Sequence, residues 1–236
     1  MSKALSTIHT HATEFWMARG AVGAIVVLQL LLSSRVTIGP WWLAPAIEAA
    51  LFLPLSAATA WAQDEVVRAT HEHHWHMIAK RRRLIRWLAV ILTGMITLLN
   101  LGSLIMVVTA LLGGQAANNG RALLLDAVII WGINVIAFAL WYWDIDRGGP
   151  AARGITRKCV IDFLFPQMTV EQHPDDQEWS PGFIDYLYVA FTNATAFSPT
   201  DTLPLTRRAK MLMMIQSGIS LMTIALVAAR AVNILS

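Results

Sequence analysis

A run of oxygen-bearing side chains near the C-terminus has the residue types that could guide an ion or a small polar solute. The candidates for a pore or solute site are Thr192, Thr195, Ser198, Thr200, Asp201 and Gln216. Hydroxyl and carboxylate oxygens are groups that a membrane pathway can offer in place of water. The same bend also has a purely structural interpretation, in which Ser198 caps a helix with Pro199 at its first position and Asp201 at its third. Both interpretations stay open.

The sequence HEHHWH at 71–76 is the only cluster that resembles a metal site. Its candidate ligands are His71, His73 and His76. On a helix, His73 and His76, or Glu72 and His76, would share a face, as two ligands of one metal must. The cluster adjoins KRRR at 80–83, where a plain polar helix is the alternative and weak metal or pH sensing is the functional reading. We predict no cofactor.

Four polar side chains fall inside otherwise apolar segments, namely Glu48, Asn100, Asp126 and Asn134. Such residues are candidates for function, although hydrogen bonds between helices, about 0.6 kcal/mol each, are the alternative. Glu48 and Asp126 could line one outward-facing vestibule. The sequence has no Ser-His-Asp grouping, phosphate loop or zinc-protease helix, so we assign no catalytic residue and do not predict an enzyme.

These residues must be positioned by membrane helices. The chain is 56% hydrophobic and only 14% charged, and its apolar residues fall in blocks that could cross a hydrocarbon core of about 30 Å. We predict an all-α integral membrane protein, a single membrane domain over 1–236. The expected transmembrane helices are 18–34, 41–62, 87–112, 122–143 and 210–235, with a cytoplasmic helix at 63–86 and a polar loop at 144–182.

The segment 183–197 is amphipathic but too short to cross the bilayer. It is followed by the polar bend and then by the last apolar helix, an order typical of a re-entrant hairpin. The fold prediction is therefore five transmembrane helices plus one re-entrant half-helix.

Basic residues predict the orientation, because Lys and Arg accumulate on the cytoplasmic side. With five crossings and a cytoplasmic N-terminus, 15 of the 18 basic residues fall in inside segments. We therefore expect a multi-pass protein of the bacterial cytoplasmic (inner) membrane, with its C-terminus outside. The basic residues flank the spans without a nucleic-acid reading surface, so the expected partner is the lipid bilayer and not nucleic acid.

The sequence FTNATAFSPTD resembles the pore helix and filter of the potassium-channel superfamily, in which a T-x-x-T step precedes a glycine-tyrosine-glycine turn and an aspartate. Thr192 and Thr195 match that step, and Asp201 comes one residue late. Phe197, Ser198 and Pro199 replace the turn, and Phe and Pro do not adopt the positive φ of a carbonyl filter. The resemblance therefore implies a pore-like hairpin that is not of the potassium type.

A second resemblance covers most of the chain. DYLYVAFT, SPTD, TRR and WYWDIDRGGP are similar to a domain-of-unknown-function family of small bacterial integral membrane proteins, particularly its actinobacterial members. It implies no activity.

Two functional hypotheses follow. In the first, the chain is a channel-like or solute-conducting protein, and a homo-oligomer because one hairpin cannot ring a pore. In the second, it is a non-conducting interaction or sensing module that acts through the His/Arg-rich helix at 63–86.

Overall fold

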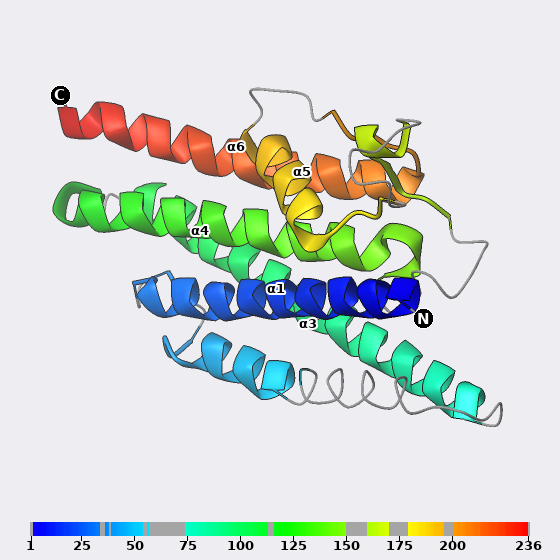
Figure 1. Cartoon of the computed structure of the whole chain (residues 1–236). Helices are drawn as coiled ribbons and strands as arrows, with labels where there is room; N and C mark the ends of the chain where they lie inside the picture. Colours follow the sequence, from blue (N-terminus) through cyan, green and yellow to red (C-terminus); the bar gives the residue numbers. More distant parts are fainter. Residues whose placement is uncertain are drawn as a thin grey trace.

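A computed structural model of the chain describes residues 2–33, 36–37, 39–53, 56, 74–112, 116–149, 160–169, 179–195 and 201–235. Long helices form a bundle: α1 (Ser2–Leu31), the helical residues Leu43–Leu53, α3 (His74–Leu112), α4 (Ala116–Ile145) and α6 (Arg207–Leu235). Helix α4 lies at its centre and contacts α1, α3 and α6. The two termini lie at opposite ends of the bundle (Figure 1).

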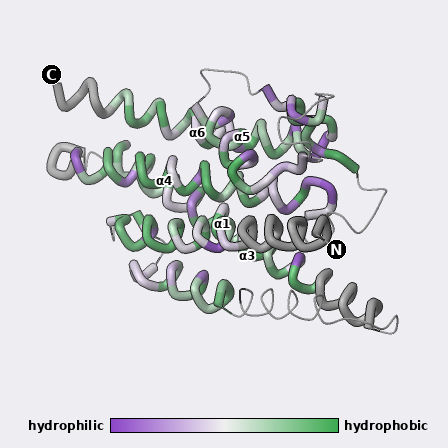
Figure 2. Tube along the Cα trace, viewed as in Figure 1, coloured by the Kyte–Doolittle hydropathy of each residue, from purple (hydrophilic) through white to green (hydrophobic). Residues whose placement is uncertain are grey.

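Three of the helical segments are long and apolar enough to cross a membrane: Leu84–Leu111, Arg121–Gly148 and Arg207–Ala229. Two shorter apolar helices, Trp16–Leu31 and Leu43–Leu53, accompany them. Figure 2 shows hydrophobic residues along these helices and hydrophilic segments around the C-terminal end of α4. The prediction of an α-helical protein with helices of membrane length is confirmed to this extent.

These helices are apolar on their outer surfaces and on their inner surfaces. Leu98 and Ile105 on α3, and Met214 and Leu221 on α6, are each more than half exposed. A helix of a water-soluble bundle turns a polar face outward, whereas a helix in lipid has no need of one. The interior is built mainly on α4, where Ile130, Ile133, Phe138 and Tyr142 are almost fully buried.

The hydrophilic helix predicted at 63–86 is described from His74 onward, and there it is continuous with the next predicted helix. From His74 the chain continues without a break to Leu112 as α3. Lys80, three arginines and Arg86 are good helix formers, and no proline interrupts this stretch. Residues 57–73 lie outside the described part of the chain, and they include His71 and His73.

Two very short strands are an addition to the expected fold. Strand β1 (Phe163–Leu164) pairs antiparallel with β2 (Leu203–Pro204), with Phe163 opposite Pro204 and Leu164 opposite Leu203. The sequence pattern predicts a polar loop over residues 160–165 and no strand there. Pairs of two residues are too short to show the alternation that identifies a strand. Their pairing ties the segment after α4 to the segment before α6.

The exit from α4 is a tight turn in which three consecutive residues have positive φ. These are Arg147 (52°), Gly148 (80°) and Gly149 (85°). At Gly149, a Cβ atom would lie 2.8 Å from the backbone oxygen of Asp144. Only glycine therefore fits this turn without moving the backbone, and the turn directs Asp146 toward β1.

We expect Gly149→Ala to lower the free energy of unfolding by about 1–3 kcal/mol, because alanine is strained at this backbone conformation and its methyl group would meet the Asp144 carbonyl. Thermal unfolding in detergent measures the loss. Gly23→Ala is the control, since a Cβ there meets nothing within 4 Å and alanine favours a helix interior. Equal melting temperatures for Gly149→Ala and wild type would contradict this account.

Candidate functional site

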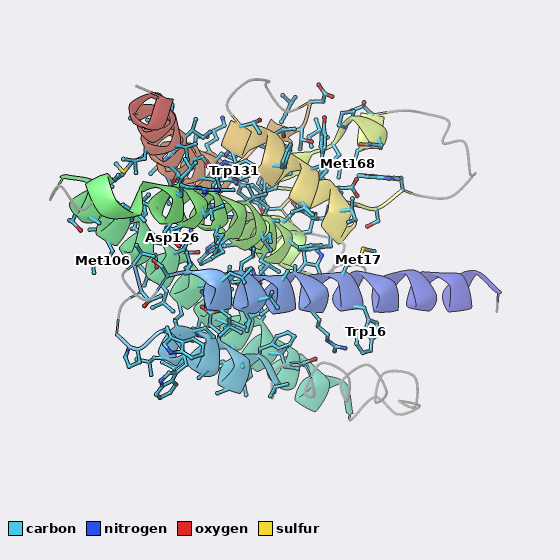
Figure 3. The ribbon with its side chains drawn as sticks, turned by 90° about the vertical axis from the view of Figure 1, so that its left-hand side faces the viewer. Trp16, Met17, Met106, Asp126, Trp131 and Met168 are labelled. Carbon is cyan, nitrogen blue, oxygen red and sulfur yellow. The ribbon has the colours of Figure 1, made fainter. Side chains whose placement is uncertain are left out.

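Helix α5 (Phe183–Thr195) lies at an angle across α4 and also contacts α6 (Figure 1). At one end the ring of Phe183 makes an edge contact with Trp143, with ring centroids 6.0 Å apart. At the other end Phe191 makes the same kind of contact with Trp131 at 5.8 Å. The two tryptophans are about 18 Å apart along the helix axis. Figure 3 shows Trp131 beside α5.

After α5 the chain returns to the end from which it started. Strand β2 pairs with β1 beside the C-terminal end of α4, and α6 begins there with Arg208, whose guanidinium lies 3.4 Å from the backbone oxygen of Ile145. We call the segment from Phe183 to Pro204 the hairpin. Its bend, including Ser198 and Thr200, lies outside the residues that the structure describes.

The base of the hairpin is held by a buried carboxylate, Asp146. One of its oxygens accepts the backbone N–H groups of Asp162 at 2.8 Å and Phe163 at 3.3 Å. The other accepts the hydroxyl of Tyr186 on α5 at 2.6 Å. Asp146 is fully buried, and Arg147 lies 3.7 Å from it. This single side chain therefore fixes β1 and the first turn of α5 to the end of α4.

A second buried carboxylate, Asp162, holds the start of α6. Arg208 donates to both of its oxygens, at 2.6 and 2.5 Å, in the two-pronged geometry that suits a guanidinium and a carboxylate. The Thr206 hydroxyl donates to the same carboxylate at 2.5 Å. The backbone oxygen of Asp162 also accepts the N–H of Leu205 at 2.8 Å. Both ends of the hairpin are thus anchored at one level of the bundle.

Deeper in the bundle, Gln216 on α6 joins three helices. Its side-chain oxygen accepts the Tyr142 hydroxyl of α4 at 2.5 Å and the Asn193 amide of α5 at 2.8 Å. Its amide nitrogen donates to the backbone oxygen of Ala190 at 2.8 Å. Gln216 is fully buried, so these bonds replace all contact with solvent. Its place in this network makes it a positioning residue for the hairpin.

Further hydrogen bonds extend this network along α6. The Asn193 amide also donates to the backbone oxygen of Met213 at 3.0 Å, and the Ser217 hydroxyl donates to the Asn193 side-chain oxygen at 3.1 Å. Asn134, a predicted intramembrane polar residue, donates to the Ser220 hydroxyl at 2.8 Å. Asn134 thus bonds between helices, as the structural alternative expects.

The two threonines of the T-x-x-T step face their own helix. The Thr192 hydroxyl donates to the backbone oxygen of Tyr188 at 2.9 Å, and that of Thr195 donates to the backbone oxygen of Thr192 at 2.9 Å. Their remaining lone pairs can still accept from a solute. Asp201, at the start of the returning segment, is exposed. The structure thus brings Gln216 next to α5, while Ser198 and Thr200 lie outside the described residues, so the prediction of one lined path stays a prediction.

The two acids predicted inside the apolar segments, Glu48 and Asp126, accept hydrogen bonds from α1 and from Ser33, just after its end. Gln29 donates to Glu48 at 2.7 Å. Ser33, one helical turn further on, donates its backbone N–H at 3.0 Å and its hydroxyl at 2.7 Å to Asp126. Figure 3 shows Asp126 close to the end of α1. Asn100 on α3 donates to the backbone oxygen of Ile130 on α4 at 3.1 Å.

The predicted metal ligands are not tested by these contacts. His71 and His73 lie outside the described residues, and for His76 only the helical backbone is described. Among the described side chains, no group of three or more His, Cys, Asp or Glu residues is placed to hold a metal ion.

Sequence reasoning missed the residues that position the hairpin, chiefly Tyr142, Asp146, Asp162 and Asn193. A weak signal was present, since Tyr142 and Asp146 lie in the WYWDIDRGGP segment quoted for its resemblance. Comparisons with family models, with curated proteins and with solved structures found no match. The functional interpretation therefore depends on the geometry of the chain itself.

We expect Gln216→Leu to destabilise the protein by about 1–3 kcal/mol, because it leaves the buried Tyr142 hydroxyl without its acceptor and removes one hydrogen bond each from Asn193 and the Ala190 carbonyl. The measurement is thermal unfolding in detergent. Thr223→Val is the matched control on α6, since Thr223 is equally buried but its hydroxyl bonds only to Ile219 of its own helix. If both variants have the melting temperature of the wild type, Gln216 does not hold the hairpin.

Proposed function

We propose that the protein is a channel-like, solute-conducting integral membrane protein whose hairpin enters the bilayer from the cytoplasmic side and turns back within it. The observation that carries the proposal is that the chain before and after α5 lies at the same end of α4. Helix α5 has 13 residues, about 20 Å, which is too short for a hydrocarbon core of about 30 Å. It starts at the end of α4, and the chain returns to that same end.

The arrangement of the helices supports five crossings. Helices α1, α3 and α6 run in one direction along the bundle, and α4 and Leu43–Leu53 run in the other (Figure 1). In the proposed topology the two shorter apolar helices supply the first two crossings. Arg86, Arg147 and Arg208 lie at the end where the hairpin begins, which favours that end as the cytoplasmic one.

The outer face of the hairpin supports its contact with lipid or with another copy of the chain. Ile184, Tyr188 and Phe191 lie along the exposed side of α5, each about half exposed. These three residues follow the helical spacing, so α5 is apolar on its outer side as well as on the side that packs against α4. A helix with apolar residues on both sides is typical of a lipid environment or a protein interface. Conduction through a central axis would require these faces to meet in a homo-oligomer.

In this proposal the residues of the hairpin have two roles. Asp146, Asp162 and Gln216 position α5 and its return through satisfied hydrogen bonds. Thr195 and Asp201 lie at the end of α5 and at the start of the return, beside the bend, and offer the oxygens that a solute would meet.

Cysteine labelling tests the course of the hairpin. In a Cys159→Ser background, we expect Ser180→Cys and Asp201→Cys to react with a membrane-impermeant reagent from the same side, because both flank a helix that does not cross. Ser236→Cys should react from the opposite side. Labelling of positions 180 and 201 from opposite sides would mean that α5 crosses the membrane, and the hairpin proposal would fail.

Ion flux into liposomes tests conduction. We expect the wild type to conduct in at least one of several salts, and Thr195→Val or Asp201→Ala to lower the flux about tenfold, which needs a barrier change of only about 1.4 kcal/mol. Thr109→Val is the matched control, because its hydroxyl also bonds within its own helix, on α3 and away from the hairpin.

Flux through the wild type no greater than through empty vesicles, in every salt, would instead favour the non-conducting module that acts through residues 63–86. Equal losses in Thr195→Val and Thr109→Val would indicate a folding effect and would contradict the assigned role of Thr195.

A further inference from the structure

Of the three helical segments of membrane length, the one in α6 is the least buried. Only 17% of it is buried, against 61% for the segment in α4. Helix α6 lies at the edge of the bundle beside α4 and α5 (Figure 1). Gln216 and Thr223 are fully buried on its inner side, so the opposite side is the one that meets the surroundings.

This opposite side of α6 combines basic and apolar residues. Its members recur at steps of four and three, which places them along one side of a helix. They are Arg207, Met211, Met214, Gly218, Leu221 and Ala225, and all are exposed. Lys210 is also exposed and borders this set at the same end as Arg207. We call this set, together with Lys210, the outer face of α6.

The two basic residues of the outer face have no counter-charge among the described residues. Arg208 forms an ion pair with Asp162, whereas Arg207 and Lys210 form none with any described carboxylate. The carboxylate of Asp201 is exposed and pairs with neither of them. The outer face therefore has two uncompensated positive charges at the point where its apolar residues begin.

The segment just before α6 also has exposed apolar side chains. Leu203 and Leu205 are separated by Pro204, which puts them on one side of the extended chain, and each is about half exposed. Exposed leucines close to exposed cations are typical of the boundary between lipid headgroups and acyl chains. The start of α6 thus has the side chains of a membrane–water interface.

The apolar part of the outer face has the length of one lipid leaflet. From Lys210 to Leu221 the helix rises about 16 Å, close to half of a hydrocarbon core of about 30 Å. At Gly218, a Cβ atom would meet nothing within 4 Å. The helix therefore leaves open space beside its backbone at that level, where an acyl chain can lie.

The charges of the outer face favour one occupant. The phosphate of an anionic phospholipid balances the cations, and its acyl chains cover the apolar residues. In a zwitterionic lipid the phosphate is already balanced by the cation of its own headgroup. A second copy of the chain, packed through the same face with parallel helices, would place Arg207 next to its counterpart, and like charges repel.

We propose that the outer face of α6 binds one anionic phospholipid, whose phosphate contacts Arg207 and Lys210 and whose acyl chain lies along the helix toward Leu221. The site rests on the proposed function only in that α6 must cross the membrane, and it does not require conduction.

Native mass spectrometry of the full chain in detergent, titrated with lipid, tests the site. We expect phosphatidylglycerol, which has a net negative charge, to bind about tenfold more tightly than phosphatidylcholine with the same acyl chains. Arg207→Gln should remove this preference, whereas Arg207→Lys keeps the charge and should retain most of it. Inorganic phosphate should not displace the lipid, because it cannot replace the contacts of the acyl chain.

Arg121→Gln is the matched control, because Arg121 is an exposed basic residue at the start of the membrane-length segment of α4, away from α6. It should keep the preference for phosphatidylglycerol. Arg208 is left unchanged because it holds Asp162.

The proposal is overturned if the two lipids bind equally, if Arg207→Gln keeps the preference, or if Arg121→Gln loses it to the same degree. Displacement of the lipid by inorganic phosphate would overturn the contact with the acyl chain. A lipid-free dimer that forms more readily in Arg207→Gln would show that a second copy covers this face, which also overturns the proposal. These outcomes are independent of the labelling and the ion flux expected of the hairpin.

Discussion

The side-chain amide of Gln216 is the interaction on which the arrangement of α4, α5 and α6 depends. Within an apolar environment each unmet polar group costs several kcal/mol. If Gln216, Asn193 and Tyr142 lay apart on their three helices, each would leave a polar group without a partner. Brought together, the oxygen of Gln216 accepts from two of them and its nitrogen meets the backbone of the third. The observed placement of the three helices satisfies all of these groups at once.

The contacts of charged side chains lie at the C-terminal end of α4, away from Gln216. The hydrogen-bond donors to Asp146 are uncharged, with Arg147 at 3.7 Å, whereas Asp162 accepts hydrogen bonds from the guanidinium of Arg208. The Arg208 side chain is half exposed while Asp162 is fully buried, so the pair lies at a boundary between the interior and the surroundings. Charged groups are tolerated at such a boundary and would be expensive deeper down. Charges therefore fix the base of the hairpin, and amides fix its inner end.

The elements of this fold could be predicted from the sequence better than the contacts between them. Apolar length identified the long helices, and the short amphipathic segment was expected at 183–197 and is helical over Phe183–Thr195. The contacts join residues far apart in the chain, as in Tyr186 with Asp146 or Arg208 with Asp162. Periodicity assigns a residue to a face of its helix but does not name its partner on another element. The strands β1 and β2 were missed for a related reason, since only their mutual pairing defines them.

The buried polar residues that the structure describes fall into two kinds, those with matched donors and acceptors and those with acceptors in excess. Around Gln216 the donors and acceptors match, which is the usual state of buried polar groups. Around Glu48 acceptors are in excess. Donors are present in this region, because Ser33, one helical turn from Gln29, donates two hydrogen bonds to Asp126. Ser33 thus donates to both oxygens of Asp126, whereas only one oxygen of Glu48 accepts a hydrogen bond among the described residues.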